Sequence, residues 1–260
     1  MKLTIWILLC VCFFAACPAI KAGEPVFVEN KGQWPRDVLY FADYKGLQYW
    51  ITGNSIVIDK FKIESVEESI MDSFDKPEFT SLIKSGSVTI IEFGGAEERP
   101  GSDGIPSSSY YNYFIGSDTT AWVAGAKAYK SILLKGLYEG IDLSLYFEET
   151  GMRHDFILQP GADPSVINYR ITGADDIRQT DNKTMEIVTA AGDIYIGSIA
   201  AYSGASLSAA DSVKCSLVSE PGRPIHFQLG NYDKSKPLVI DPLIYSTFLG
   251  GSRFEQAKDI

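Results

Sequence analysis

Acidic side chains gather on one predicted β-hairpin, formed by strands at residues 142–147 and 152–158. Asp142 and Glu148 are an even number of residues apart, so they can share a face, and Glu149 and Asp155 are near them in sequence. Two facing carboxylates can hydrolyse a glycosidic bond. No feature of the sequence indicates a cleft or a partner group, and solvated strand and turn positions explain these residues more simply. We therefore predict no catalytic residue and no enzyme activity; part of an extracellular hydrolase is an alternative.

The usual ligands of zinc are scarce. His154 and His226 are the only histidines, and a zinc site requires three or four clustered ligands. Three of the four cysteines fall within the first 22 residues, which leaves Cys215 with no partner for an internal disulfide. We interpret the histidines as ordinary strand residues and Cys215 as a small buried hydrophobe.

Turn-forming acidic residues could supply the hard oxygen ligands that calcium prefers. The chain has no EF-hand loop and no glycine–aspartate repeat, and Asp and Asn favour turns because their side chains bond to the nearby backbone. We therefore predict no metal site and no cofactor. The residues concerned are Asp163, Asp175, Asp176, Asp181 and Asn182.

Nucleotide and nucleophile motifs are absent from the sequence. Gly94–Gly95 and Gly250–Gly251 lack the Gly-Lys-Ser/Thr of a phosphate loop, and Gly204-Ala205-Ser206 is no nucleophile elbow. The net charge of −10, from 23 basic and 33 acidic residues, leaves no basic stripe for a phosphate backbone. Nucleic acid is therefore not an expected partner.

Aromatic residues offer one binding chemistry. Trp34, Trp50 and Trp122, with numerous tyrosines, could form a platform on which sugar rings stack. Aromatic side chains on β-strands more often fill the core. A carbohydrate-binding module that uses exposed aromatic residues is thus an alternative function, and burial of Trp122 would remove its main support.

The elements that carry these residues are predicted to be short β-strands. Turn residues separate them at a spacing of about 8–12 residues without intervening helices, which is typical of an antiparallel sandwich or barrel. We predict an all-β, antiparallel β-sandwich-like domain over residues 24–243. The expected strands are 25–29, 38–42, 47–52, 55–62, 87–93, 142–147, 152–158, 166–172, 177–180, 184–189, 193–196, 199–203, 212–219 and 224–229.

Two stretches interrupt this rhythm. Residues 64–84 are charged and contain Pro77, which suggests a short helical excursion from the sheet. Residues 94–109 are rich in glycine and proline with few apolar side chains, which predicts a long loop and a joint between two lobes.

The N-terminus is predicted to be a signal peptide over residues 1–22. Lys2 precedes an apolar stretch at 5–16, which is shorter than the roughly 20 residues that span a membrane. Cleavage after Ala22 would release an exported protein, secreted or at the cell surface, with no transmembrane helix. Lipid anchoring through Cys17 is the alternative, although Phe14 and Pro18 fit a lipoprotein signal poorly.

Several phrases, taken in order, resemble a known family. They are Glu29-Asn30-Lys31-Gly32-Gln33-Trp34-Pro35, Asn112-Tyr113-Phe114-Ile115-Gly116, Leu137-Tyr138-Glu139-Gly140-Ile141-Asp142-Leu143, Asp155-Phe156-Ile157-Leu158-Gln159-Pro160-Gly161-Ala162-Asp163-Pro164 and Pro237-Leu238-Val239-Ile240-Asp241-Pro242. The chain resembles the N-terminal domain of unknown function of secreted and surface proteins of bacteria, chiefly Bacteroidetes, in which it precedes SBBP-type β-propeller repeats.

The tail is similar to the start of such a propeller. Tyr245-Ser246-Thr247-Phe248-Leu249-Gly250-Gly251-Ser252 resembles the opening of a first repeat, so residues 244–260 are expected to be a truncated repeat and the chain a fragment. The resemblance implies downstream propeller repeats as a partner. From these observations we expect a non-catalytic accessory, adhesion or assembly domain, with a surface glycan or a protein as its ligand.

Overall fold

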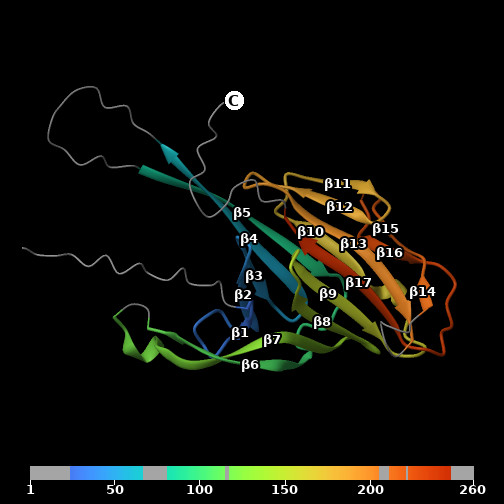
Figure 1. Ribbon diagram of the computed structural model, residues 1–260, viewed down its shortest axis with the longest axis horizontal. Coiled ribbons are helices and arrows are strands. Elements are labelled where there is room, and N and C mark those ends of the chain that lie inside the picture. The colour runs from blue at the N-terminus through green and yellow to red at the C-terminus, as the bar shows by residue number, and fades with distance from the viewer. Residues whose placement is uncertain (1–23, 67–80, 115–116, 205–210, 221, 247–260) are drawn as a thin grey trace, which may run out of the picture.

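A computed structural model of the chain describes residues 24–66, 81–114, 117–204, 211–220 and 222–246 (Figure 1). These residues form 17 β-strands, and every strand pair is antiparallel. Two short 3₁₀ turns, η1 (Thr119–Ala121) and η2 (Pro164–Val166), complete the elements. The predicted all-β, antiparallel fold is confirmed. No helix in these ranges is long and apolar enough to cross a membrane.

The 17 strands differ widely in length. Their bounds are β1 (Phe27–Glu29), β2 (Tyr40–Tyr44), β3 (Leu47–Ile51), β4 (Ser55–Val66), β5 (Ser81–Phe93), β6 (Gly101–Tyr113), β7 (Val123–Tyr138), β8 (Ile141–Phe147), β9 (Met152–Leu158), β10 (Asn168–Thr172), β11 (Asp176–Asp181), β12 (Thr184–Val188), β13 (Ile194–Ser203), β14 (Asp211–Val213), β15 (Cys215–Val218), β16 (Ile225–Leu229) and β17 (Leu238–Tyr245).

One continuous sheet folds over itself into two layers. The first layer runs in the order β15, β16, β10, β5, β4, β3, β2, β1, and the second in the order β8, β9, β17, β13, β12, β11. Strand β7 joins them, because it pairs with β1 near Ala128 and with β8 from Ser131 onward. On the other side, β14 pairs with β13 while β15 pairs with β16, and only Lys214 separates the two strands.

Aromatic side chains from both layers fill the space between them. Phe156 of β9 contacts Phe93, Tyr169 and Phe227 of the first layer, with ring centroids 5.7, 6.2 and 5.9 Å apart. At the β1 end, Phe27 stacks on Phe147 at 4.7 Å. The alternation along each strand directs these side chains inward, where they join one cluster of buried apolar residues.

The long loop predicted over 94–109 is wrong for residues 101–109. Gly101–Tyr113 form β6, which pairs with β7 along its length with three register shifts. Its residues are mostly exposed, so the strand lacks the apolar alternation that identifies a half-buried strand. Strands β7 and β17 were also not predicted, although the sequence phrases include parts of both.

The helical excursion predicted over 64–84 is also wrong where the structure describes it. Residues 64–66 continue β4 and residues 81–84 begin β5; the remaining part, 67–80, lies outside the described residues. β4 and β5 pair from Ser55↔Glu92 to Val66↔Ser81. Beyond Lys60 in β4 and before Ile90 in β5, none of the described strands pairs with this hairpin as a third strand, and it projects from the body at the upper left of Figure 1. We call residues 61–66 and 81–86 the distal arm.

Candidate functional site

An asparagine organises the loop that follows β1. The Asn30 side-chain amide donates to the carbonyls of Trp34, Pro35 and Val38 at 3.2, 2.8 and 2.8 Å, and its oxygen accepts from the Gly32 and Trp34 amides. These bonds hold Trp34 against the outer face of the first layer. The sequence phrase 29–35 thus encodes a specific loop rather than a simple turn.

Trp34 belongs to an aromatic cluster on that outer face. Its ring lies 5.3 Å from Phe41, 5.7 Å from Trp50 and 5.1 Å from Tyr113, and Phe41 contacts Trp50 at 4.6 Å. The rings are tilted or edge-on to one another, an arrangement that aromatic pairs favour. Trp34 and Trp50 are only half-buried, and they pack on each other instead of forming a flat platform.

More aromatic surface lies on the β6–β7 hairpin, beside this cluster. Phe114 and Trp122 contact each other at 5.3 Å and are 57% and 42% exposed, and Tyr110 is 68% exposed. Trp122 is therefore not a core residue. Its burial would have removed the main support for a carbohydrate-binding module, so that alternative stays open. Tyr113 contacts Trp34, so the two aromatic regions meet.

A groove runs between this hairpin and β2. Its floor includes Val28 of β1, which is only 4% exposed and pairs with Phe41 in β2 and with Ala128 in β7. Tyr111 and Tyr113 of β6 line one part, and residues 24–26 and 41–45 line the rest of a hollow of about 780 Å³. We call it the aromatic groove.

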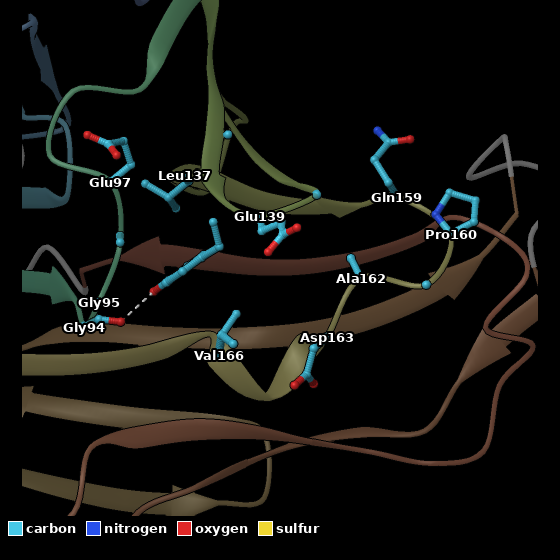
Figure 2. A pocket seen from close by; sticks show the side chains of 15 residues that line it. Gly94, Gly95, Glu97, Leu137, Glu139, Gln159, Pro160, Ala162, Asp163 and Val166 are labelled. Atoms are coloured by element: carbon cyan, nitrogen blue, oxygen red, sulfur yellow. Dashed lines mark hydrogen bonds between the residues drawn. The ribbon is translucent and has the colours of Figure 1, made fainter.

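A larger hollow of about 1040 Å³ lies at one end of the sandwich (Figure 2). Three turns surround it, at residues 94–97, 136–140 and 159–163. The Tyr138 hydroxyl donates to the Gly94 carbonyl at 3.3 Å and the Glu97 amide donates to the Leu137 carbonyl at 2.8 Å, which tie these turns together. Glycines and backbone make up much of its wall, and Gly94 is not part of a phosphate loop.

The second layer carries a buried carboxyl pair. Asp155 of β9 is 5% exposed and faces the carboxylate of Asp241 in β17. Tyr146 donates to Asp155 Oδ2 at 3.1 Å, while Arg153 donates to Asp241 at 3.0 Å and to Glu148 at 3.0 Å. Burial and the facing Asp241 carboxylate raise the pKa of Asp155 well above its ordinary value. Burial and the same carboxylates also raise the pKa of Tyr146.

Only part of the predicted acidic group comes together in this cluster. Asp155 and Glu148 both belong to it, linked through Arg153. Asp142 instead accepts from the Gly136 amide at 2.8 Å, and Glu149 is exposed in the β8–β9 turn. Asp142 and Glu148 therefore do not face each other across a cleft.

Sequence reasoning missed Asp241, Tyr146 and Arg153 as members of this cluster. Asp241 is 86 residues from Asp155 and becomes its neighbour only because β9 pairs with β17. The presence of an acidic residue in each of two sequence phrases was the one available signal. That signal could not establish strand pairing.

The two histidines occupy different environments. His154 is fully buried in the core, where Nε2 shares a 2.8 Å hydrogen bond with the Tyr169 hydroxyl, and burial lowers its pKa to about 3. His226 lies on β16, with Nδ1 at 3.4 Å from the Pro224 carbonyl. Cys215 is buried, and burial raises the pKa of its thiol to about 11, which disfavours the reactive thiolate.

The predicted turn acids bond to their own turns. Asp163 caps η2 by accepting from Ser165, Asp176 pairs with Arg178 at 2.8 Å, and Asp181 accepts from the Lys183 amide at 2.6 Å. Asp175 and Asn182 lie in the turns on either side of β11. No group of three or more His, Cys, Asp or Glu residues is arranged to hold a metal ion in the part of the chain that the structure describes.

Comparison with protein families gives one result. Residues 27–243 match the family described as Domain of unknown function (DUF7948). The chain belongs to this family. No curated protein and no solved structure matches it.

Most of the sequence phrases of this DUF7948 domain lie at structural junctions. Phrase 29–35 forms the Asn30 loop, and phrase 137–143 forms the β7–β8 turn at the larger hollow. Phrases 155–164 and 237–242 contribute Asp155 and Asp241. These four phrases therefore supply turns and non-local contacts of the fold.

Proposed function

We propose that this DUF7948 domain is a non-catalytic adhesion or assembly module of an exported bacterial surface protein, placed ahead of β-propeller repeats. The observation that supports it is the aromatic surface outside the core, with Phe114 57% and Trp122 42% exposed on one hairpin. Exposed aromatic patches on a protein surface commonly mark contact sites for a partner. The sequence resemblance to Bacteroidetes proteins supports the export and propeller parts of the proposal.

The position of the end of β17 supports an assembly role. Ile244 near the end of β17 pairs with Met152, beside the β8–β9 turn, and Tyr44 donates to Glu149 of that turn at 3.5 Å. Tyr44 closes β2 at the end of the first layer from which the distal arm projects. A module that follows β17 would thus begin near the distal arm.

Carbohydrate binding is the second candidate, and the exposure of Trp122 favours it. The aromatic hairpin offers ring faces to a ligand, and a surface sugar would give an adhesion module its target. A protein ligand for the same hairpin remains part of the first proposal.

The test uses the full chain on a glycan array and on whole bacterial cells. Replacing both Phe114 and Trp122 by alanine should lower retention at least tenfold, because this removes two large exposed aromatic contacts. Val166→Ala is the control, since Val166 is also an exposed apolar residue, at 39%, but borders the larger hollow. Turnover of a glycan or peptide that is lost in Asp142→Asn or Glu148→Gln would contradict the proposal.

A further inference from the structure

The geometry points to the aromatic groove as a binding site for a neutral oligosaccharide, an inference that rests on the proposed adhesion function and names its ligand class. The groove combines a concave shape, aromatic walls and a few polar groups, which together characterise small-ligand sites. Its hollow of about 780 Å³ lies within the range of such sites.

The aromatic walls come from separate elements. Tyr111, 39% exposed, and the half-buried Tyr113 belong to β6, while Phe41 belongs to β2. The short strand β1 lies between β2 and β7, so Val28 forms a low floor below these rings. A pyranose ring presents apolar C–H groups on its faces, and these pack favourably against aromatic rings.

Neighbouring rings hold two of these wall residues in place. Tyr113 packs against Trp34, which the Asn30 loop fixes, and Phe41 packs between Trp34 and Trp50. Ligand binding at a preformed site avoids the entropic cost of ordering side chains. The outer aromatic cluster thus has a function in this proposal, as the support of one groove wall.

The polar groups around the groove favour a neutral ligand over a charged one. Glu24 already pairs with Lys130 at 2.8 Å, and Asp43 accepts from Gln48 at 3.3 Å. The Lys45 ammonium lies 5.7 Å from the centre of the Tyr44 ring. Acidic and basic side chains both lie at the rim, where they can bond to sugar hydroxyl groups. Their mixed charges give no strong attraction for a polyanion or a polycation.

The experiment is calorimetric titration of the full chain with neutral hexasaccharides of the cello-, xylo-, manno- and chito- series. At least one should bind, and Tyr111→Ala should weaken that binding about tenfold, since a lost aromatic contact costs about 1.4 kcal/mol. Tyr110→Ala is the matched control, because Tyr110 is the adjacent residue of β6, is 68% exposed and does not line the groove. Its affinity should stay within about twofold of the unmodified chain.

Three outcomes would overturn the inference. These are no binding of any hexasaccharide at millimolar concentration, equal losses in the two tyrosine variants, and capture of an unstructured peptide that sugars do not displace. Tyr111 lies on a strand at the edge of the sheet, and near-UV circular dichroism verifies that both variants fold. If Phe114 and Trp122 prove necessary for retention on cells while Tyr111→Ala binds sugar normally, the groove assignment fails and the adhesion function stands.

Discussion

At the scale of single residues, the Asp155–Asp241 contact is the feature that ordinary surface chemistry explains least. Two carboxyl groups face each other on the outer side of the second layer, and Asp155 is 5% exposed. No hydrogen-bond donor reaches Asp155 Oδ1. A proton on Asp155 resolves this arrangement, because the protonated group can donate to Asp241, whereas two ionised carboxylates would repel each other.

The first prediction concerns how stability depends on pH. Folded Asp155 retains a proton that the unfolded chain releases above its ordinary pKa of 3.8, because burial and Asp241 raise its pKa in the folded state. The folded state then binds more protons than the unfolded state, so this group's contribution to stability falls as pH rises from about 4 through the raised pKa. Asp155→Asn, which retains a donor toward Asp241, should remove this part of the fall.

The measurement is the melting temperature of the chain and of Asp155→Asn at intervals between about pH 4 and pH 9. The difference between the variant and the unmodified chain should shift in favour of the variant as pH rises. Glu149→Gln is the control, since Glu149 is exposed in the neighbouring turn and should leave the profile unchanged. A difference that stays constant with pH would show that Asp155 is ionised in the folded chain.

At the scale of elements, the distal arm is the least supported part of the sheet. Among the described strands, residues 61–66 have ladder partners at residues 81–86 on one side alone, whereas Ile56 and Ile58 are fully buried between β3 and β5. An isolated two-stranded hairpin is marginally stable in water. The arm should therefore open locally far more often than the body of the same two strands.

Hydrogen exchange followed by mass spectrometry tests this second prediction. Peptides covering residues 61–66 and 81–86 should exchange at least a hundredfold faster than those covering 55–60 and 87–93, a difference of about 2.7 kcal/mol in opening free energy. The body of the hairpin is an internal control, since it lies in the same strands. Equal protection would mean that another surface covers the arm in solution.

Strands with clear alternation were predictable, and those without it were not. The pattern at 47–52 predicted β3, and the flanking strands at 142–147 and 152–158 predicted β8 and β9 with their turn. β6 was not predicted because its exposed glycines, serines and proline have the composition of a loop. The expected strands at 193–196 and 199–203 are one strand, β13, interrupted at Ser198, whose φ is 51°, and by a register shift.

The candidate sites, too, were predictable only in part. Residue types indicated an aromatic surface that includes Trp34, Trp50 and Trp122, and all three are partly or largely exposed. The aromatic groove requires Phe41 and Tyr111 from different parts of the chain, and the carboxyl pair requires Asp241 beside Asp155. Such groupings depend on strand order, which local periodicity does not encode.

At the scale of the whole molecule, strands that pair with both layers connect the two layers at each side of the sandwich. β7 connects β1 to β8, and the β14–β15 segment crosses from β13 to β16. The β15 end is fastened further by the Leu217 amide, which donates to the Asn182 carbonyl at 2.9 Å, and by Gln179, which donates to the Leu217 carbonyl at 2.9 Å. If one layer unfolds, the other therefore loses its hydrogen-bonded neighbours at these closing strands.

This closure leads to the third prediction, which also tests the expected division into two lobes near residues 94–109. Phe156→Ala removes a ring that touches Phe93, Tyr169 and Phe227, and should destabilise the chain by about 3–5 kcal/mol. Because both layers share that core, tryptophan fluorescence, which samples Trp34 and Trp50 on the first layer and Trp122 on the β6–β7 hairpin, and far-UV circular dichroism should give one coincident unfolding transition in denaturant. The variant should shift the midpoints of the fluorescence and circular-dichroism curves equally. If the two lobes unfolded independently, the two methods would report different midpoints. Val166→Ala, outside the core, should shift neither curve by more than about 0.5 kcal/mol.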